Sequence, residues 1–92
     1  NYNCYDLAHG YVDDEIKMPA KIQFFRVFKT KKDENFAFLT IYDLSGEANN
    51  VMLPSKQYEE YKDLIFEDNK IFITGNYDKK RSTVSIKEIK QL

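Results

Sequence analysis

Residues 35–43 constrain the fold of this chain most, because their side chains alternate in character with a period of two. An extended strand places alternate side chains on opposite faces. One face carries small and aliphatic residues suited to a core, so the other, largely aromatic face is expected to point outward. The inner set is Ala37, Leu39 and Ile41, and the outer set is Phe36, Phe38, Thr40 and Tyr42. Residues 43–46 form a tight turn with Gly46 available for a positive φ, so this strand is predicted to begin a hairpin.

Four further strands are expected at residues 16–28, 47–53, 70–77 and 83–90. Adjacent apolar residues in the first of these indicate a strongly bent strand or a bulge, and the Asn49-Asn50 pair in the second indicates a bulge. In the strand at residues 83–90, Val84 and Ile86 point inward, and the alternation shifts to the other face before Ile89. The core of a small barrel needs large side chains, so at least one of three phenylalanines of the first strand is expected to be buried: Phe24, Phe25 or Phe28.

A single helical segment interrupts the strands at residues 56–65. Its apolar residues recur at helical spacing, and Ser55 is expected to cap its N-terminus after Pro54. The predicted buried face consists of Tyr58, Tyr61, Leu64 and Ile65.

The element order is therefore β-β-β-α-β-β, which predicts an all-β fold with one helix, the five-stranded Greek-key barrel known as the OB-fold. The helix would close one end of the barrel. An α+β sandwich with the same element order is the alternative. Residues 1–15 are polar and are expected to form a lead-in or linker segment, with the OB-fold domain over residues 16–92.

Composition limits the function classes. The chain has 92 residues, of which 42% are hydrophobic, which suits one domain with one modest core. A lone cysteine, Cys4, excludes an internal disulfide and favours a cytoplasmic location. No signal peptide or membrane-spanning run is apparent.

One cysteine and one histidine, His9, make no zinc or catalytic set, and no glycine-rich phosphate loop occurs. We therefore expect a non-catalytic binding module without cofactor, metal, membrane partner or small-molecule substrate.

The net charge of −1 does not indicate a nucleic-acid-binding protein, so a basic site would have to come from local clustering. In an OB-fold, the loops between strands one and two and between strands four and five flank the binding face. Both are basic here. Together with outward aromatic rings for base stacking, they give the candidate nucleic-acid-binding residues Lys29, Lys31, Lys32, Phe36, Phe38, Tyr42, Lys79, Lys80 and Arg81. The alternatives are ordinary solvated turns and an aromatic face that docks protein.

From Lys17 to Ile89, the chain resembles the OB-fold nucleic-acid-binding domain of the bacterial DNA polymerase III alpha subunit. The resemblance rests on Thr30-Lys31-Lys32 and on the run from Ala37 to Gly46, with support from Leu53-Pro54 and Ile73-Thr74-Gly75. Asp33 departs from the glycine usual after the two lysines. That change is expected to stiffen or reshape the loop.

The resemblance implies a domain that holds single-stranded template DNA during replication, beside other domains of a polymerase and replisome subunits. The polymerase's catalytic aspartates lie in another domain, and none maps onto this chain. Two other functions compete with this one. One is a protein-interaction OB-fold domain. The other is the anticodon-binding domain of class II aminoacyl-tRNA synthetases, which shares the pattern of Phe38, Asp43 and Gly46.

Overall fold

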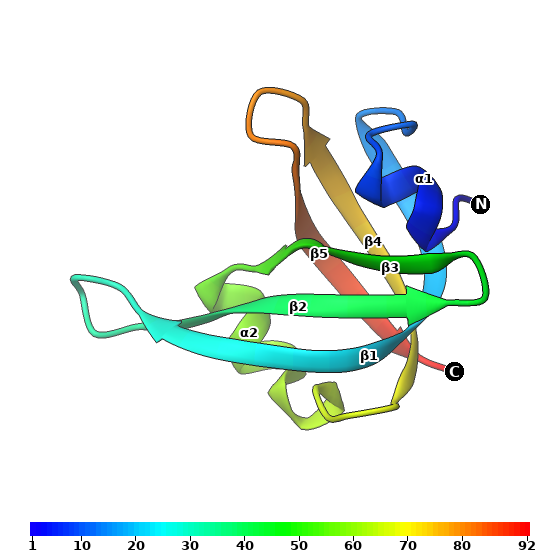
Figure 1. The fold of residues 1–92 in the computed structure, drawn as a ribbon. Helices are drawn as coiled ribbons and strands as arrows, with labels where there is room; N and C mark the ends of the chain where they lie inside the picture. The colour runs from blue at the N-terminus through cyan, green and yellow to red at the C-terminus, as the bar shows by residue number, and fades with distance from the viewer.

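The structure, a computed structural model that describes residues 1–92, is a closed barrel of five strands in the order β1-β2-β3-β5-β4 (Figure 1). The predicted OB-fold is therefore confirmed. β3 and β5 pair in parallel, and the other neighbours pair antiparallel. The strands are β1 (Glu15–Lys29), β2 (Asn35–Asp43), β3 (Gly46–Leu53), β4 (Lys70–Asp78) and β5 (Thr83–Gln91).

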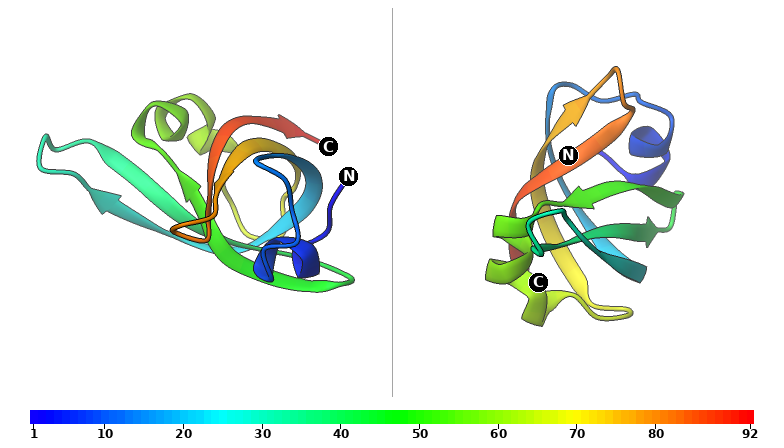
Figure 2. Two further views of the ribbon diagram at one scale, coloured as in Figure 1. Left: turned by 90° about the horizontal axis from the view of Figure 1, so that it is seen from above. Right: turned by 90° about the vertical axis from the view of Figure 1, so that its left-hand side faces the viewer.

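β1 takes part in two successive pairings because it is long and bent. Residues 15–21 pair with β4, and residues 21–29 pair with β2. The register shifts between Ile22 and Phe24, which is the bulge expected in this strand. Beyond the bulge, β1 pairs only with β2, whose residues 37–39 still pair with β3 on their other side, and the hairpin then extends away from the ring of strands (Figure 2). We refer to residues 23–39 as the β1–β2 arm.

Aliphatic side chains fill the barrel. The inner set predicted for β2, Ala37, Leu39 and Ile41, is buried, as expected. The prediction that a phenylalanine of β1 fills the core is wrong, because Phe24, Phe25 and Phe28 are 50%, 37% and 43% exposed. They follow the bulge and lie on the arm, where no opposing wall of the barrel covers them. Isoleucine, leucine, valine and methionine supply the core volume instead.

The other two predicted irregularities are also present. Between Leu39 and Ile41 of β2, the paired residues on β3 jump from Val51 to Ala48, so Asn49-Asn50 holds the bulge. On β5, Ile86 and Ile89 are both buried because the register with β4 shifts between them. One outward residue of β2 departs from expectation: Thr40 is buried among its neighbours on the outer face, opposite Phe24.

The helix α2 (Ser55–Tyr61) and the 3-10 turn η1 (Lys62–Leu64) lie against one end of the barrel (Figure 1). Tyr58, Tyr61 and Leu64 pack on the core and Ile65 is buried, so the predicted face is confirmed. The predicted cap is wrong. Pro54 occupies the N-cap position, and its carbonyl accepts from the Tyr58 N–H at 2.7 Å, so the helix already includes Ser55.

Residues before β1 form part of the same core. The short helix α1 (Cys4–Ala8) lies at the opposite end of the barrel from α2 in Figure 1. Cys4, Leu7 and Val12 are buried in the core cluster. Burial, reinforced by the nearby Asp43 carboxylate, raises the pKa of the Cys4 thiol to about 12. The thiol is therefore protonated and unreactive in the folded domain.

Asp43, at the end of β2, fastens α1 to the β2–β3 turn. Its carboxylate accepts from the Cys4 N–H at 3.0 Å and from the Ser45 N–H and hydroxyl at 2.8 and 2.5 Å. Partial burial opposes ionisation, but these hydrogen bonds outweigh it and hold the pKa of Asp43 below its usual value. The ionised form therefore stabilises the fold.

We expect Asp43→Asn to lower the free energy of unfolding by about 1 kcal/mol at pH 7, because charged hydrogen bonds become neutral ones. A group with a depressed folded-state pKa contributes stability above its unfolded pKa and loses that contribution as the pH falls through the folded value. The difference from wild type should therefore be constant above about pH 5 and shrink below about pH 4. Urea unfolding at several pH values measures it. Asp14→Asn is the charge-matched control, and an equal loss in that variant would rule out a role for the hydrogen bonds.

Candidate nucleic-acid interface

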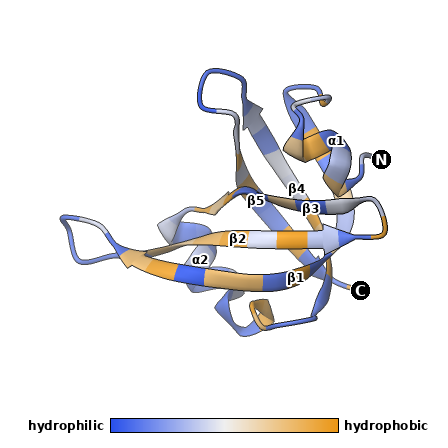
Figure 3. Ribbon diagram, in the orientation of Figure 1, coloured by the Kyte–Doolittle hydropathy of each residue, from blue (hydrophilic) through white to orange (hydrophobic).

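The outer face of the β1–β2 arm carries a row of phenylalanines from both strands. Paired residues of an antiparallel ladder share a face. The pairs Phe28 with Phe36 and Arg26 with Phe38 therefore place these side chains together, beside the Phe24–Thr40 pair. Hydrophobic residues follow both strands of the arm almost to its polar loop (Figure 3). Phe24, Phe28, Phe36 and Phe38 with Arg26 are called the aromatic face below.

Three of these rings form a cluster with fixed geometry. The centroids of Phe28 and Phe36 are 5.6 Å apart with an interplanar angle of 29°. Phe38 meets both rings edge-on, at 6.1 and 6.2 Å. These separations lie in the range in which aromatic pairs attract each other. The cluster is therefore organised before any ligand binds.

A shallow pocket of about 280 Å³ lies on the aromatic face, between Phe24, Phe28 and Phe38 and the polar Thr40 and Asn49. Arg26 borders it and forms no ion pair. Phe24 is half exposed, and Phe38 is 37% exposed. Large exposed aromatic patches are uncommon on monomeric proteins and mark binding surfaces. A guanidinium beside exposed rings suits a ligand that is both anionic and flat.

The β1–β2 loop adds cations at the tip of the arm. Lys29 is paired with Asp33 at 3.1 Å, whereas Lys31 and Lys32 are exposed and form no ion pair. The Thr30 hydroxyl accepts from the N–H groups of Lys32 and Glu34, both at 3.2 Å. Asp33 adopts a φ of 65°, the left-handed conformation that glycine favours. The loop thus keeps the backbone form suited to glycine while Asp33 offsets one of its cations.

The β4–β5 loop has a similar internal organisation. The Asp78 carboxylate accepts from the N–H groups of Lys80 and Arg81 at 2.9 and 3.3 Å, and it lies 3.9 Å from the Arg81 guanidinium. Lys79 and Lys80 remain exposed without an ion pair. In Figure 1 this loop projects from the top of the barrel and the β1–β2 loop from its side, so the two sets of cations lie apart. A ligand must extend over the barrel to contact both.

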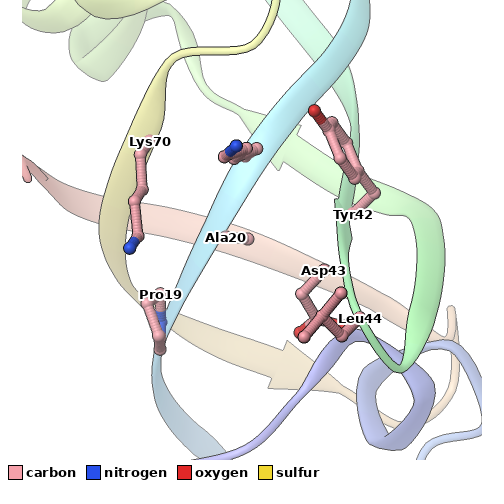
Figure 4. A pocket seen from close by; sticks show the side chains of 7 residues that line it. Pro19, Ala20, Tyr42, Asp43, Leu44 and Lys70 are labelled. Carbon is pink, nitrogen blue, oxygen red and sulfur yellow. The ribbon is translucent and has the colours of Figure 1, made fainter.

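Tyr42 lies away from the other candidate residues. Its hydroxyl donates to Asp68 at 2.7 Å, which raises the pKa of the phenol. It borders a pocket of about 320 Å³ between β1, β4 and the β2–β3 turn, with Pro19 and Lys70 on the far side (Figure 4). Several acidic side chains line the adjoining surface: Asp43, Glu47, Glu67 and Asp68. These carboxylates repel phosphates, so this region is unsuited to a nucleic-acid backbone.

Three residues of the aromatic face were not among the sequence-predicted candidates: Phe24, Arg26 and Phe28. A signal for them was present. They are spaced two apart, and a hairpin that closes at residues 29–35 pairs them with Thr40, Phe38 and Phe36. Because aliphatic residues fill the core, Phe24 and Phe28 are not needed there and lie on the outer face with Arg26.

No protein-family model matches the chain, and no curated protein sequence matches it either. None of its helices is long and apolar enough to cross a membrane. The structure contains no group of three or more histidine, cysteine, aspartate or glutamate side chains placed to hold a metal ion.

Proposed function

We propose that this OB-fold domain binds single-stranded DNA along its aromatic face. The observation that carries the proposal is the set of four phenylalanines around the unpaired Arg26 on β1 and β2. Stacking of a base on an aromatic ring contributes about 1–3 kcal/mol and tolerates any base, because every base has a flat face. Sequence preference should therefore be slight.

The phosphates would follow the cations of the arm and its loop, namely Arg26, Lys31 and Lys32. A longer strand would extend toward Lys79 and Lys80. Asp33 and Asp78 reduce the local positive field, so binding is expected to be weak and salt-sensitive.

Fluorescence anisotropy of labelled oligo-dT, titrated with the domain at two salt concentrations, tests this proposal. We expect saturable binding that weakens with salt and is stronger than binding to a duplex of equal length. An anticodon stem-loop RNA serves as competitor. Preference for that RNA would indicate the synthetase-type function, and absence of binding at low salt would refute the proposal.

Replacing Lys31 and Lys32 with alanine should weaken binding to all sequences and flatten the salt dependence. Each phosphate contact contributes about 0.7 to the slope of log K against log salt for single strands, so losing two should lower the slope by about 1.4. Lys87→Ala with Lys90→Ala is the control, because it removes the same charge from β5. An equal change in both double variants would mean that net charge alone acts.

The wider setting we propose is a replicative DNA polymerase of the polymerase III alpha type, supported by the resemblance of Thr30-Lys31-Lys32 and residues 37–46. In that setting the domain holds template strand and contributes no catalytic group. The same lysine substitutions, made in the parent polypeptide, should shorten the products synthesised on a primed single-stranded template. Unchanged product lengths would contradict the polymerase setting while leaving DNA binding intact.

A further inference from the structure

The outer edge of β1 lacks a partner strand along the arm. Its ladder with β4 ends at the Lys21–Lys70 pair. The next residue is still satisfied, because the Ile22 N–H donates to the Asn69 carbonyl and the Ile22 carbonyl accepts from the Asp68 N–H. Over residues 23–29, β1 pairs only with β2. This segment is called the open edge.

The register indicates which peptide groups are unpaired. The Thr30 N–H donates to the Glu34 carbonyl at 2.8 Å, so these two residues form a hydrogen-bonded pair. Bonded and non-bonded pairs alternate along an antiparallel ladder. The peptide groups of Phe25, Val27 and Lys29 therefore point away from β2. They form an extended row of donors and acceptors that another strand can satisfy.

The open edge is only partly protected. Natural sheet edges are commonly blocked by proline or by charged side chains, or are covered by a loop or helix. Residues 23–29 contain no proline and no acidic residue, their charges are the basic Arg26 and Lys29, and both faces of the segment carry exposed apolar side chains. Phe24 and Phe28 lie on the outer face, whereas Phe25 and Val27, 37% and 41% exposed, lie on the other. A strand added here would gain backbone hydrogen bonds, apolar contacts with Phe25 and Val27 on one face, and contacts with Arg26 and its neighbouring rings on the other.

Charge distinguishes between possible occupants. If two copies paired antiparallel through this edge with their apolar residues matched, Arg26 would lie opposite Arg26. Like charges directly opposite one another destabilise a sheet. An incoming strand with carboxylates would instead pair with Arg26. We propose that the open edge of β1 binds, by strand addition, an extended segment of another protein in which apolar and acidic residues alternate.

The test uses an end-blocked eight-residue peptide of alternating valine and glutamate, titrated into the domain by NMR. Binding should slow hydrogen exchange at the Phe25, Val27 and Lys29 amides, which exchange rapidly in the free domain. Arg26 and Phe28 amides should be protected already. A valine–lysine peptide is the charge control and should bind about tenfold more weakly or not at all.

Val27→Pro tests the backbone directly. Its N–H faces the open edge rather than β2, so proline removes a donor for the added strand and leaves the hairpin bonds in place. We expect peptide affinity to fall about tenfold, with oligo-dT binding unchanged as a measure of the folded arm. Val27→Thr keeps the N–H and should retain peptide binding.

Three results would overturn the proposal. The first is no binding of the valine–glutamate peptide and no new amide protection at millimolar concentration. The second is equal binding of the two peptides, which would remove the acidic preference. The third is concentration-dependent dimerisation that protects the same amides, detected by sedimentation, because a second copy would then be the occupant.

Discussion

Replacing Phe28 and Phe38 with alanine should weaken oligo-dT binding about 30-fold or more, because two stacking surfaces are lost at about 1–3 kcal/mol each. Phe28 and Phe38 are the two ring neighbours of Phe36 in the cluster, so the double substitution also leaves Phe36 without either of them. The salt slope should stay at the wild-type value, since no cation is removed. Anisotropy titrations at several salt concentrations measure both quantities.

Two controls separate stacking from general damage. Phe66→Ala removes a half-exposed ring after η1, and Phe25→Ala removes a ring from the opposite face of the arm. Neither should change oligo-dT affinity. Thermal unfolding should show only a small loss of stability in the double variant, because both rings are partly exposed already. If the double variant unfolds or binds normally, the aromatic face is not the DNA-binding surface.

Gly75→Ala should lower the free energy of unfolding by about 3 kcal/mol, at the upper end of the cost of overpacking. A Cβ at this position would lie 2.6 Å from the Ser85 carbonyl oxygen and 3.2 Å from the Ile86 Cα. Both are backbone atoms of β5 at the point where its register with β4 shifts, so the neighbours cannot rotate away. The midpoint of thermal unfolding should fall by about 12–24 °C for a domain of this size.

The adjacent substitution Asn76→Ala provides the control. Asn76 lies next to Gly75 on β4 and is exposed, so its truncation should change stability by less than about 0.5 kcal/mol. Calorimetry or urea unfolding of the two variants measures the difference. Similar midpoints would mean that β4 and β5 can separate to admit a side chain.

The sequence predicts part of the candidate site. Lys31 and Lys32 were identified from the resemblance and from the position of their loop, and Phe36 and Phe38 from strand alternation. Tyr42 shares that alternation, yet it lies beside Asp68 because β2 runs from the arm into the barrel wall. The side-chain period of two indicates on which face of a strand a residue lies, but not whether that part of the strand lies in the arm or in the barrel wall. Phe24, Arg26 and Phe28 became part of the site only through cross-strand pairing.

The sequence by itself determined the order of the five strands and α2, the core face of β2, the bulges and the buried face of α2. These follow from local spacing, because the side-chain period and the position of turn residues are set by neighbours in the chain. Only the tertiary structure decided that β1 continues past the barrel as an arm, which exposes Phe25 and Val27 and leaves an unpaired edge. It also joined Cys4 and Leu7 to the core through Asp43. Burial depends on what lies across the barrel, and residues distant in the sequence supply that wall.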